Sequence, residues 1–202
     1  MATVNARAIS EEKRDAIIEI MARDFIDLVV ITESKRWDDT WNTRLSGPQF
    51  QLGIINCTRP SPTGSDRGGV VIMYRMPVLT IAHVTLHSNT MITCEVTFDN
   101  NGHSQMFNLI GIYINPAPND DERQSIEKWK KITKECIAHS TSPILVMGDL
   151  NTEGREFLHQ KLLRIAPIDD YIGDSPTFTI PNTQKTRSLD GVFARNLPQA
   201  KI

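Results

Sequence analysis

The sequence predicts a single layered α/β domain, and three observations support this fold class. The chain has 202 residues, of which 40% are hydrophobic and 23% charged, a composition typical of a globular domain with a substantial core. It begins with a short β-prone stretch, an amphipathic helix and a continuous apolar run, an order typical of α/β folds. No repeat, low-complexity tract or linker divides the sequence, so we expect one domain over residues 1–202.

Charge and cysteine content narrow the class of protein. The net charge of −2 gives no overall attraction to nucleic acid, so contact with a polyanion has to be local. Cys57, Cys94 and Cys136 form no CxxC pair, and their odd number argues against a disulfide framework. Residues 1–15 lack the apolar core of a signal peptide, and no apolar run is long enough to cross a membrane. We therefore expect a soluble intracellular protein that has no contact with membranes.

The first elements follow the order strand, helix, strand. Residues 3–7 are β-prone, and Ser10 is a suitable N-cap for a helix over 11–24 that carries an apolar stripe on one face. Residues 27–35 form a continuous apolar run that ends in Glu33, which predicts a strand buried on both faces.

The rest of the chain alternates in the same way, with turn signals between the apolar runs. It predicts a loop at 58–69, a strand at 69–75, a hairpin over 91–114 with Asn101-Gly102 as its turn, a helix at 120–140, a strand at 143–147, a helix around 155–164, and strand-like pieces at 176–180 and 188–194.

Several polar residues stand at or near the ends of predicted strands. Glu33, Tyr113 and the pair Asp149 and Asn151 follow apolar runs, and Asp190 lies where a polar loop meets an apolar segment. Layered β folds bring residues at strand ends into a common cleft. We therefore expect these side chains to form one site.

The residue types in this set suit phosphodiester hydrolysis. Mg²⁺ keeps several waters and needs only one or two protein carboxylates, so Glu33 assisted by Asn5 is sufficient to hold it. Asp149 is placed to act as the base that activates water, while Asn151 and Tyr113 can donate hydrogen bonds to a phosphate.

Each of these residues also has a structural interpretation. The GDLN segment at 148–151 taken alone is typical of a turn after a strand. Glu33 alone can be a solvated strand end, Tyr113 a core-edge aromatic, and Asn5 and Asp190 turn caps. Each residue taken alone is therefore compatible with a structural or a functional interpretation. The order of the residues along the chain favours the functional interpretation.

Taken in order, the motifs resemble the endonuclease/exonuclease/phosphatase superfamily, whose fold is shared with DNase I and the apurinic/apyrimidinic endonucleases. The motifs are NAR at 5–7, ITE at 31–33, RGG at 67–69, GDLN at 148–151 and SLD at 188–190. GDLN after an apolar run is the most specific of them. The likeness covers almost the whole chain and is greatest to the endonuclease domain of non-LTR (LINE-type) retrotransposons.

This resemblance implies a four-layered α/β/β/α sandwich of DNase I type and a role for each matching residue. Glu33 corresponds to the principal Mg²⁺ ligand and Asn5 to its companion, with Mn²⁺ as an alternative ion. Tyr113 corresponds to the tyrosine that contacts the scissile phosphate. Asp149 corresponds to the residue that activates water, and Asn151 to its phosphate-binding companion.

The resemblance also implies roles near the C-terminal end. Asp190 corresponds to an aspartate that orients a histidine, while Thr177 and Ser188 lie in segments that line the DNA groove in relatives. That histidine belongs to an SDH-like final segment, and this chain stops at Ile202 before one. We therefore expect a domain that lacks the last C-terminal strand and has weak or absent turnover. Three explanations for the missing SDH-like segment remain open. The chain is a fragment of a longer protein, or it is a binding protein without catalysis, or another subunit supplies the missing strand.

The resemblance implies two partners: a double-stranded DNA target, nicked to leave a 3′-hydroxyl, and a reverse transcriptase in the same polyprotein. Because a retrotransposon endonuclease has to reach chromosomal DNA, the resemblance also implies a nuclear location. The sequence carries no signal for an oligomeric state. Trp37 and Trp41 could line the DNA groove or cover a core edge. The basic residues expected to meet phosphates in loops or at element ends are Arg59, Arg67, Arg155, Lys185, Arg187 and Arg195.

Two other functions remain open at this level. One is a catalytically silent module that binds nucleic acid or protein on the same scaffold. The other is a phosphatase acting on inositol phosphates or lipids, because the fold alone does not determine the substrate.

Overall fold

The computed structural model describes most of the chain. The described residues are 1–35, 37–38, 46–47, 50–56, 68–76, 78–100, 103–158, 160, 169–170, 178–179, 186–187 and 190–196. Thr177 and Ser188 lie outside them, as do Trp41, Arg59, Arg67 and Lys185.

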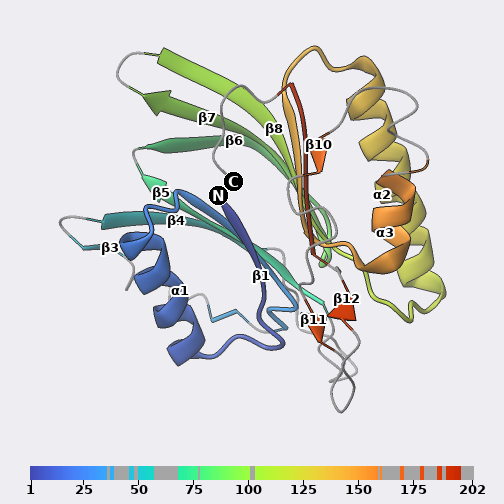
Figure 1. Ribbon diagram of the computed structural model, residues 1–202, viewed down its shortest axis with the longest axis horizontal. Helices are drawn as coiled ribbons and strands as arrows, with labels where there is room; N and C mark the ends of the chain where they lie inside the picture. The colour runs from blue at the N-terminus through green and yellow to red at the C-terminus, as the bar shows by residue number, and fades with distance from the viewer. Residues whose placement is uncertain are drawn as a thin grey trace.

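Two mixed β-sheets form the centre of the described structure (Figure 1). The first sheet has the strand order β1 (Ala2–Asn5), β2 (Leu28–Thr32), β5 (Val70–Met76), β4 (Phe50–Asn56), β3 (Ser46–Gly47). The second has the order β10 (Asp169–Asp170), β13 (Asp190–Arg195), β9 (Ile144–Asp149), β8 (His103–Tyr113), β7 (Met91–Asn100), β6 (Leu79–Ser88). A small ribbon pairs β11 (Phe178–Thr179) with β12 (Thr186–Arg187).

Helices cover the outer faces of both sheets and complete four layers. Helix α1 (Glu11–Arg23) packs on the first sheet through Ile17 and Met21. Helices α2 (Asp120–His139) and α3 (Asn151–Phe157) lie on the outer face of the second sheet (Figure 1). The expected α/β/β/α sandwich is therefore confirmed. None of the helices in the described part of the chain is long and apolar enough to span a membrane.

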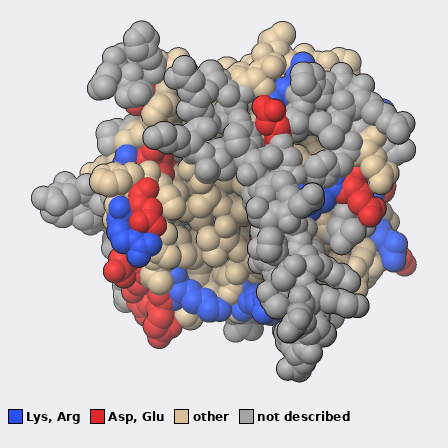
Figure 2. Space-filling model, viewed as in Figure 1, with Lys and Arg blue, Asp and Glu red and all other residues tan. Residues whose placement is uncertain are grey.

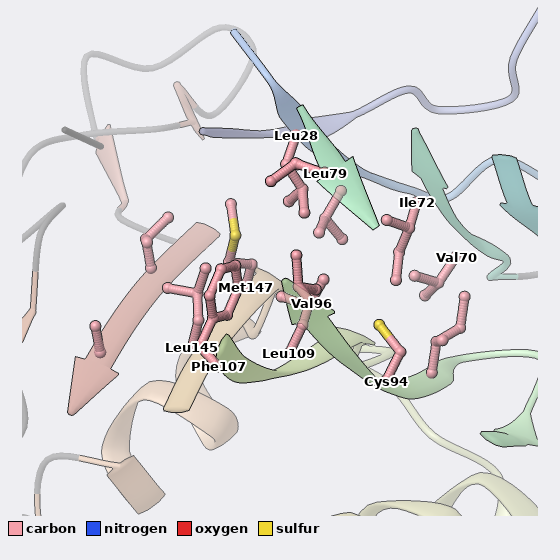
Figure 3. Packing of buried hydrophobic residues seen from close by; sticks show 14 of the residues in the cluster. Leu28, Val70, Ile72, Leu79, Cys94, Val96, Phe107, Leu109, Leu145 and Met147 are labelled. Atoms are coloured by element: carbon pink, nitrogen blue, oxygen red, sulfur yellow. The ribbon is translucent and has the colours of Figure 1, made fainter. Parts of the chain in front are cut away.

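The continuous apolar runs are explained by burial on both faces of each central strand. In β9, Leu145 and Met147 point into the core between the sheets, where they meet side chains such as Leu28 and Leu109 (Figure 3). The alternate residues of β9 pack instead against the layer that contains α2. The side chains of β2 alternate in the same way: Leu28 and Val30 pack in the core between the sheets, and Val29 and Ile31 pack against the layer that contains α1.

Local signals in the sequence account for the starts of two helices and predict one hairpin, whose expected turn residues, Asn101 and Gly102, lie outside the described residues. The Ser10 side chain accepts a hydrogen bond from the Lys13 amide at the start of α1, as expected. Asn119 and Glu122 form a reciprocal capping box at the start of α2. Strands β7 and β8 pair from Asn100 and His103 outward, so the predicted hairpin is confirmed.

The expected start of the third helix is wrong. Helix α3 begins at Asn151, directly after β9, instead of near residue 155. The cause is Leu150, which is fully buried: a Cβ on Gly154 or Gly191 would approach the Leu150 side chain to 3.0 or 2.3 Å. These two glycines leave the space into which Leu150 packs, so the chain turns into the helix at once.

Gly148 is required where β9 approaches β8. Its φ is +143°, and a Cβ at this position would lie 1.9 Å from the backbone oxygen of Ile112. We expect Gly148→Ala to lower the free energy of unfolding by about 2–4 kcal/mol, because strain and overlap combine. Urea denaturation measures this loss. Gly111→Ala is the matched control, since its nearest contact would be an ordinary 3.4 Å, and an equal effect of both changes would contradict the prediction.

Candidate active site

The strand register brings the predicted site residues to one edge of both sheets. Asn5 is aligned with Thr32 in the parallel pair β1 and β2, so Asn5 and Glu33 lie side by side. Asp149 ends β9, where its register partners are Tyr113 on β8 and Asp190 on β13. Strand β1 packs across the interface between the sheets against β9 and β13, which brings the two groups together.

The Asn5 amide connects the two sheets at this edge. Its Nδ2 donates to Asp149 Oδ2 at 2.6 Å and to Glu33 Oε1 at 3.3 Å. Its Oδ1 accepts a hydrogen bond from the Arg7 amide at 3.1 Å, which fixes the orientation of the amide plane. Two carboxylates from different sheets thus converge on one donor group.

The backbone around Glu33 is held in an unusual conformation. Glu33 has φ +51°, a region that costs a non-glycine residue about 1–3 kcal/mol. The Ala8 amide donates to the Glu33 carbonyl at 2.7 Å, and the Lys35 amide donates to Gly68 O at 2.9 Å. Lys13 Nζ in turn donates to Ala8 O at 2.9 Å. These contacts from both sides hold Glu33 in position.

Asp149 is the most buried acid of this group, with 3% of its surface exposed. Its Oδ1 accepts the Asn151 amide at 3.1 Å, so the residues form an Asx-type turn as well as part of the site. Burial raises the pKa of Asp149 to about 6, and Asp190 and Glu33 add to the increase. The hydrogen bonds from Asn151 and Asn5 oppose it. Asp149 is therefore ionised at neutral pH but is a stronger base than a surface carboxylate.

The raised pKa predicts a pH-dependent effect of Asp149→Asn on stability. The native state favours the protonated form of Asp149, so wild type loses stability as pH rises from 3.8 through about 6. With EDTA present, we expect the variant to gain about 2 kcal/mol relative to wild type between pH 4 and pH 8. Urea denaturation at several pH values measures the gain. A difference that does not change with pH would contradict the assigned pKa.

Asn151 is held by the fold through its side chain and its backbone. Its Nδ2 donates to Ile114 O at 2.5 Å, and 7% of its surface is exposed. Its φ of +47° is one that asparagine tolerates better than most residues. Nδ2 carries a second hydrogen, which leaves a donor for a ligand.

Tyr113 lies in the core between the sheets with 7% of its surface exposed. Burial, followed by the nearby Glu33 and Asp149 carboxylates, raises the pKa of the Tyr113 phenol. The hydroxyl therefore remains protonated and acts as a hydrogen-bond donor at all working pH values.

Three side chains considered for contact with nucleic acid pack against the protein itself, and Trp37 covers a core edge, which is the second alternative that the sequence left open. Arg155 is 7% exposed and donates from Nη1 to the Asp190 backbone carbonyl at 2.8 Å. Arg195 donates to the backbone carbonyl of Ile137. Trp37 is 8% exposed and packs in the apolar cluster beneath α1. These side chains support the fold, because burial of their apolar parts and backbone hydrogen bonding outweigh exposure to solvent.

The surface charge that the described residues present is mixed. On the face shown in Figure 2, Lys and Arg side chains lie among Asp and Glu side chains around the periphery. In the described part of this face they form no continuous basic surface.

The donor set at this edge suits a hard divalent cation. Glu33 supplies a carboxylate, an oxygen donor that binds Mg²⁺ or Mn²⁺ with waters completing the shell. Asn5 turns its Nδ2 toward both carboxylates and its Oδ1 toward the Arg7 amide, so its amide would have to turn for Oδ1 to join the ion. Among the described residues there is no group of three or more His, Cys, Asp and Glu side chains that could hold an ion. Glu33 therefore fits an ion that takes few protein ligands and keeps several waters.

The fold and this cluster at the strand ends define a DNase I-like phosphoesterase as the class of protein. The chain belongs to the Endonuclease/Exonuclease/phosphatase family, whose model matches residues 2–201. Members of this family are hydrolytic phosphoesterases that generally use divalent metal ions.

Solved structures with the same fold include nucleases and phosphatases. An AP endonuclease from Leishmania major has a TM-score of 0.66 at 11% identity, covering 96% of this chain and 78% of that chain. A mannosyl-6-phosphatase from Bacteroides thetaiotaomicron has a TM-score of 0.59 at 14% identity, and the match covers 96% of this chain and 84% of that chain. The catalytic domain of human Nocturnin has a TM-score of 0.56 at 14% identity, and the match covers 94% of this chain and 77% of that chain. At these identities the likeness establishes the fold alone. A search of curated protein sequences gave no match.

Proposed function

We propose that this protein is a metal-dependent phosphodiesterase that nicks double-stranded DNA in the manner of a non-LTR retrotransposon endonuclease. The observation that carries the proposal is the convergence of Glu33 and Asp149, from different sheets, on the Asn5 amide. This arrangement places Glu33, a ligand for a hard cation, close to Asp149, a buried base. The Asn5 amide is hydrogen-bonded to both carboxylates and is the group that lies between them.

In this proposal Asp149 accepts the proton of the attacking water. Its pKa of about 6 leaves it ionised at pH 7 to 8 while it binds a proton more strongly than an exposed aspartate. Asn5 and the Asn151 amide hold the carboxylate in a fixed orientation through its two oxygens. Asn151 Nδ2 and the Tyr113 hydroxyl donate to the non-bridging phosphate oxygens, where negative charge increases in the transition state.

Glu33 and Asn5 would hold Mg²⁺, or Mn²⁺ as the alternative, beside the phosphate. The chemistry that a divalent ion supplies there is stabilisation of negative charge on the phosphoryl and leaving oxygens. Glu33 is suited to this role because its conformation is fixed by the contacts of residues 8 and 35.

DNA is the proposed substrate because the local motifs NAR, ITE, RGG and SLD resemble the retrotransposon branch of the family. On that basis we also propose a nuclear location and a reverse transcriptase as a partner in the same polyprotein. Thr177 and Ser188 are proposed to line the DNA groove, and Asp190 to orient a histidine.

Nicking of supercoiled plasmid tests the proposal. We expect slow conversion to open circles with Mg²⁺, no conversion with EDTA, and a large loss in Asp149→Ala. Conversion that depends on neither the ion nor Asp149 would overturn it. Tight DNA binding without nicking would support a silent binding module instead.

A phosphatase acting on small phosphate esters is the second candidate. The net charge of −2 favours it, because a small ester carries less negative charge than a nucleic acid and needs less basic surface to bind. Release of phosphate from inositol phosphates or phospholipid headgroups, with plasmid left intact, would establish this candidate in place of the nuclease.

A further inference from the structure

We propose that Arg155 is a positioning residue that sets the start of β13, and with it Asp190, against Asp149. This inference rests on the proposed function for its catalytic consequence, whereas its structural part stands on the contacts of Arg155. The sequence suggested a loop arginine that meets phosphate, and the observed contacts point to a different role.

Arg155 holds the backbone at the point where β13 begins. Its Nη1 donates to the carbonyl of Asp190 at 2.8 Å, and Asp190 is the register partner of Asp149. A hydrogen bond to the main chain fixes the position from which the Asp190 side chain starts. The placement of this carboxylate relative to Asp149 therefore depends on Arg155.

The guanidinium group has little freedom to move away from this contact. Its carbon lies 5.5 Å from the centre of the Phe193 ring on the same strand, and 7% of the Arg155 surface is exposed. Stacking on an aromatic face restricts rotation of the planar group. Lysine has neither the plane nor the fork of donors, so it cannot reproduce both contacts.

Arg155 also belongs to the helix that carries Asn151. The two residues are four positions apart on α3, which places them one turn apart on the same side of the helix. Asn151 donates through its backbone to Asp149 and through its side chain to Ile114 O. One helix thus fixes the turn of β9 through Asn151 and the start of β13 through Arg155.

If Arg155 served only to stabilise the strand, a buried guanidinium would be an unfavourable choice. Burial of a charged group costs free energy that an apolar side chain of similar volume avoids. The directional hydrogen bond to Asp190 O is a contact that the guanidinium makes here and that an apolar side chain of similar volume could not make.

The opposite end of the same strand provides a matched control. Arg195 ends β13, donates from Nη1 to the backbone carbonyl of Ile137, and is aligned with Ile144 at the start of β9. It makes the same kind of contact as Arg155, but at the end of β13 away from Asp149. A purely structural arginine should behave alike at both positions.

The test compares Arg155→Lys and Arg155→Met with Arg195→Lys and Arg195→Met in the full chain. Nicking of a duplex oligonucleotide gives kcat and KM, and amide hydrogen exchange reports opening along β13. We expect kcat to fall about 10–100-fold in the Arg155 variants with KM nearly unchanged, by analogy with residues that orient catalytic groups. We expect Arg195 variants with the same loss of Tm to retain kcat.

Hydrogen exchange separates this inference from the proposed function. Arg155→Met should speed exchange at Gly191 and Val192, whereas Arg195→Met should affect only the far end of the strand. If wild type cleaves no DNA, the proposed function fails, and exchange alone then decides whether Arg155 positions β13. Equal losses of kcat at both positions, or unchanged exchange at Gly191 and Val192 in Arg155→Met, would overturn the inference.

Discussion

Asp149→Asn is expected to reduce DNA nicking by about 10²- to 10⁴-fold at pH 7.5, with a small change in KM. The amide retains the shape of the side chain, but its single oxygen can accept only one of the hydrogen bonds from Asn5 and Asn151, and it cannot take a proton from water. Burial raises the pKa of Asp149 to about 6 in the absence of a metal ion, and a cation held by Glu33 would lower it, so the wild-type rate should rise with pH to a plateau reached at or below about pH 6. Single-turnover rates from pH 5 to pH 8 measure both effects.

Asp99→Asn is a suitable control for this experiment. Asp99 is exposed on β7 and is aligned with Ser104 on β8, so it belongs to the far part of the second sheet. The control should nick at the wild-type rate. A variant of Asp149 with full activity would contradict its role as the base.

Glu33→Gln is expected to weaken the response to metal by on the order of 10²-fold. The substitution keeps one carbonyl oxygen but removes the negative charge that attracts a hard cation. We therefore expect the Mg²⁺ concentration for half-maximal nicking to rise strongly, with part of the activity recovered at high Mg²⁺. Calorimetric titration with Mg²⁺ alone gives a measurement that does not depend on turnover.

Glu19→Gln provides the matched comparison, because Glu19 lies exposed on α1. It should leave the metal response unchanged. The same metal dependence in Glu33→Gln and in wild type would contradict the assignment of Glu33 as the ligand.

The central strands and helices could be predicted because their signals are local. The strands beginning at Leu28 and Ile144 are buried on both faces and are therefore apolar without interruption. The start of α1 is predicted from Ser10, while Asn119 is recognised as the N-cap of α2 only in the structure. The start of α3 could not be predicted, since it depends on the packing of Leu150 among residues from another strand.

Two strands had no local signal strong enough to be predicted. Strand β6 has an exposed middle that includes His83 and Val84, so its sequence lacks the apolar character of a core strand. Strand β4 contains Gly53, where a Cβ would lie 2.1 Å from the Tyr74 ring, and glycine weakens a strand prediction. In both cases pairing with a neighbouring strand determines the structure.

The candidate site could be predicted in its residue types but not in its connections. Glu33, Tyr113 and Asp149 were found because each follows an apolar run, which is visible in the sequence. The hydrogen bonds of Asn5 to Glu33 and Asp149 join segments up to 144 residues apart and become visible only in the fold. The same limit applies to Arg155, whose partner Asp190 lies on a different element.

Cleavage in H₂¹⁸O tests the central claim most directly. A duplex oligonucleotide is nicked in a single turnover with Mg²⁺, and mass spectrometry locates the label. If Asp149 activates water at this site, one ¹⁸O enters the new 5′-phosphate, the 3′-hydroxyl remains unlabelled, and Asp149→Asn forms almost no product. Label at the 3′ end, unlabelled product, or equal product from Asp149→Asn would contradict the account.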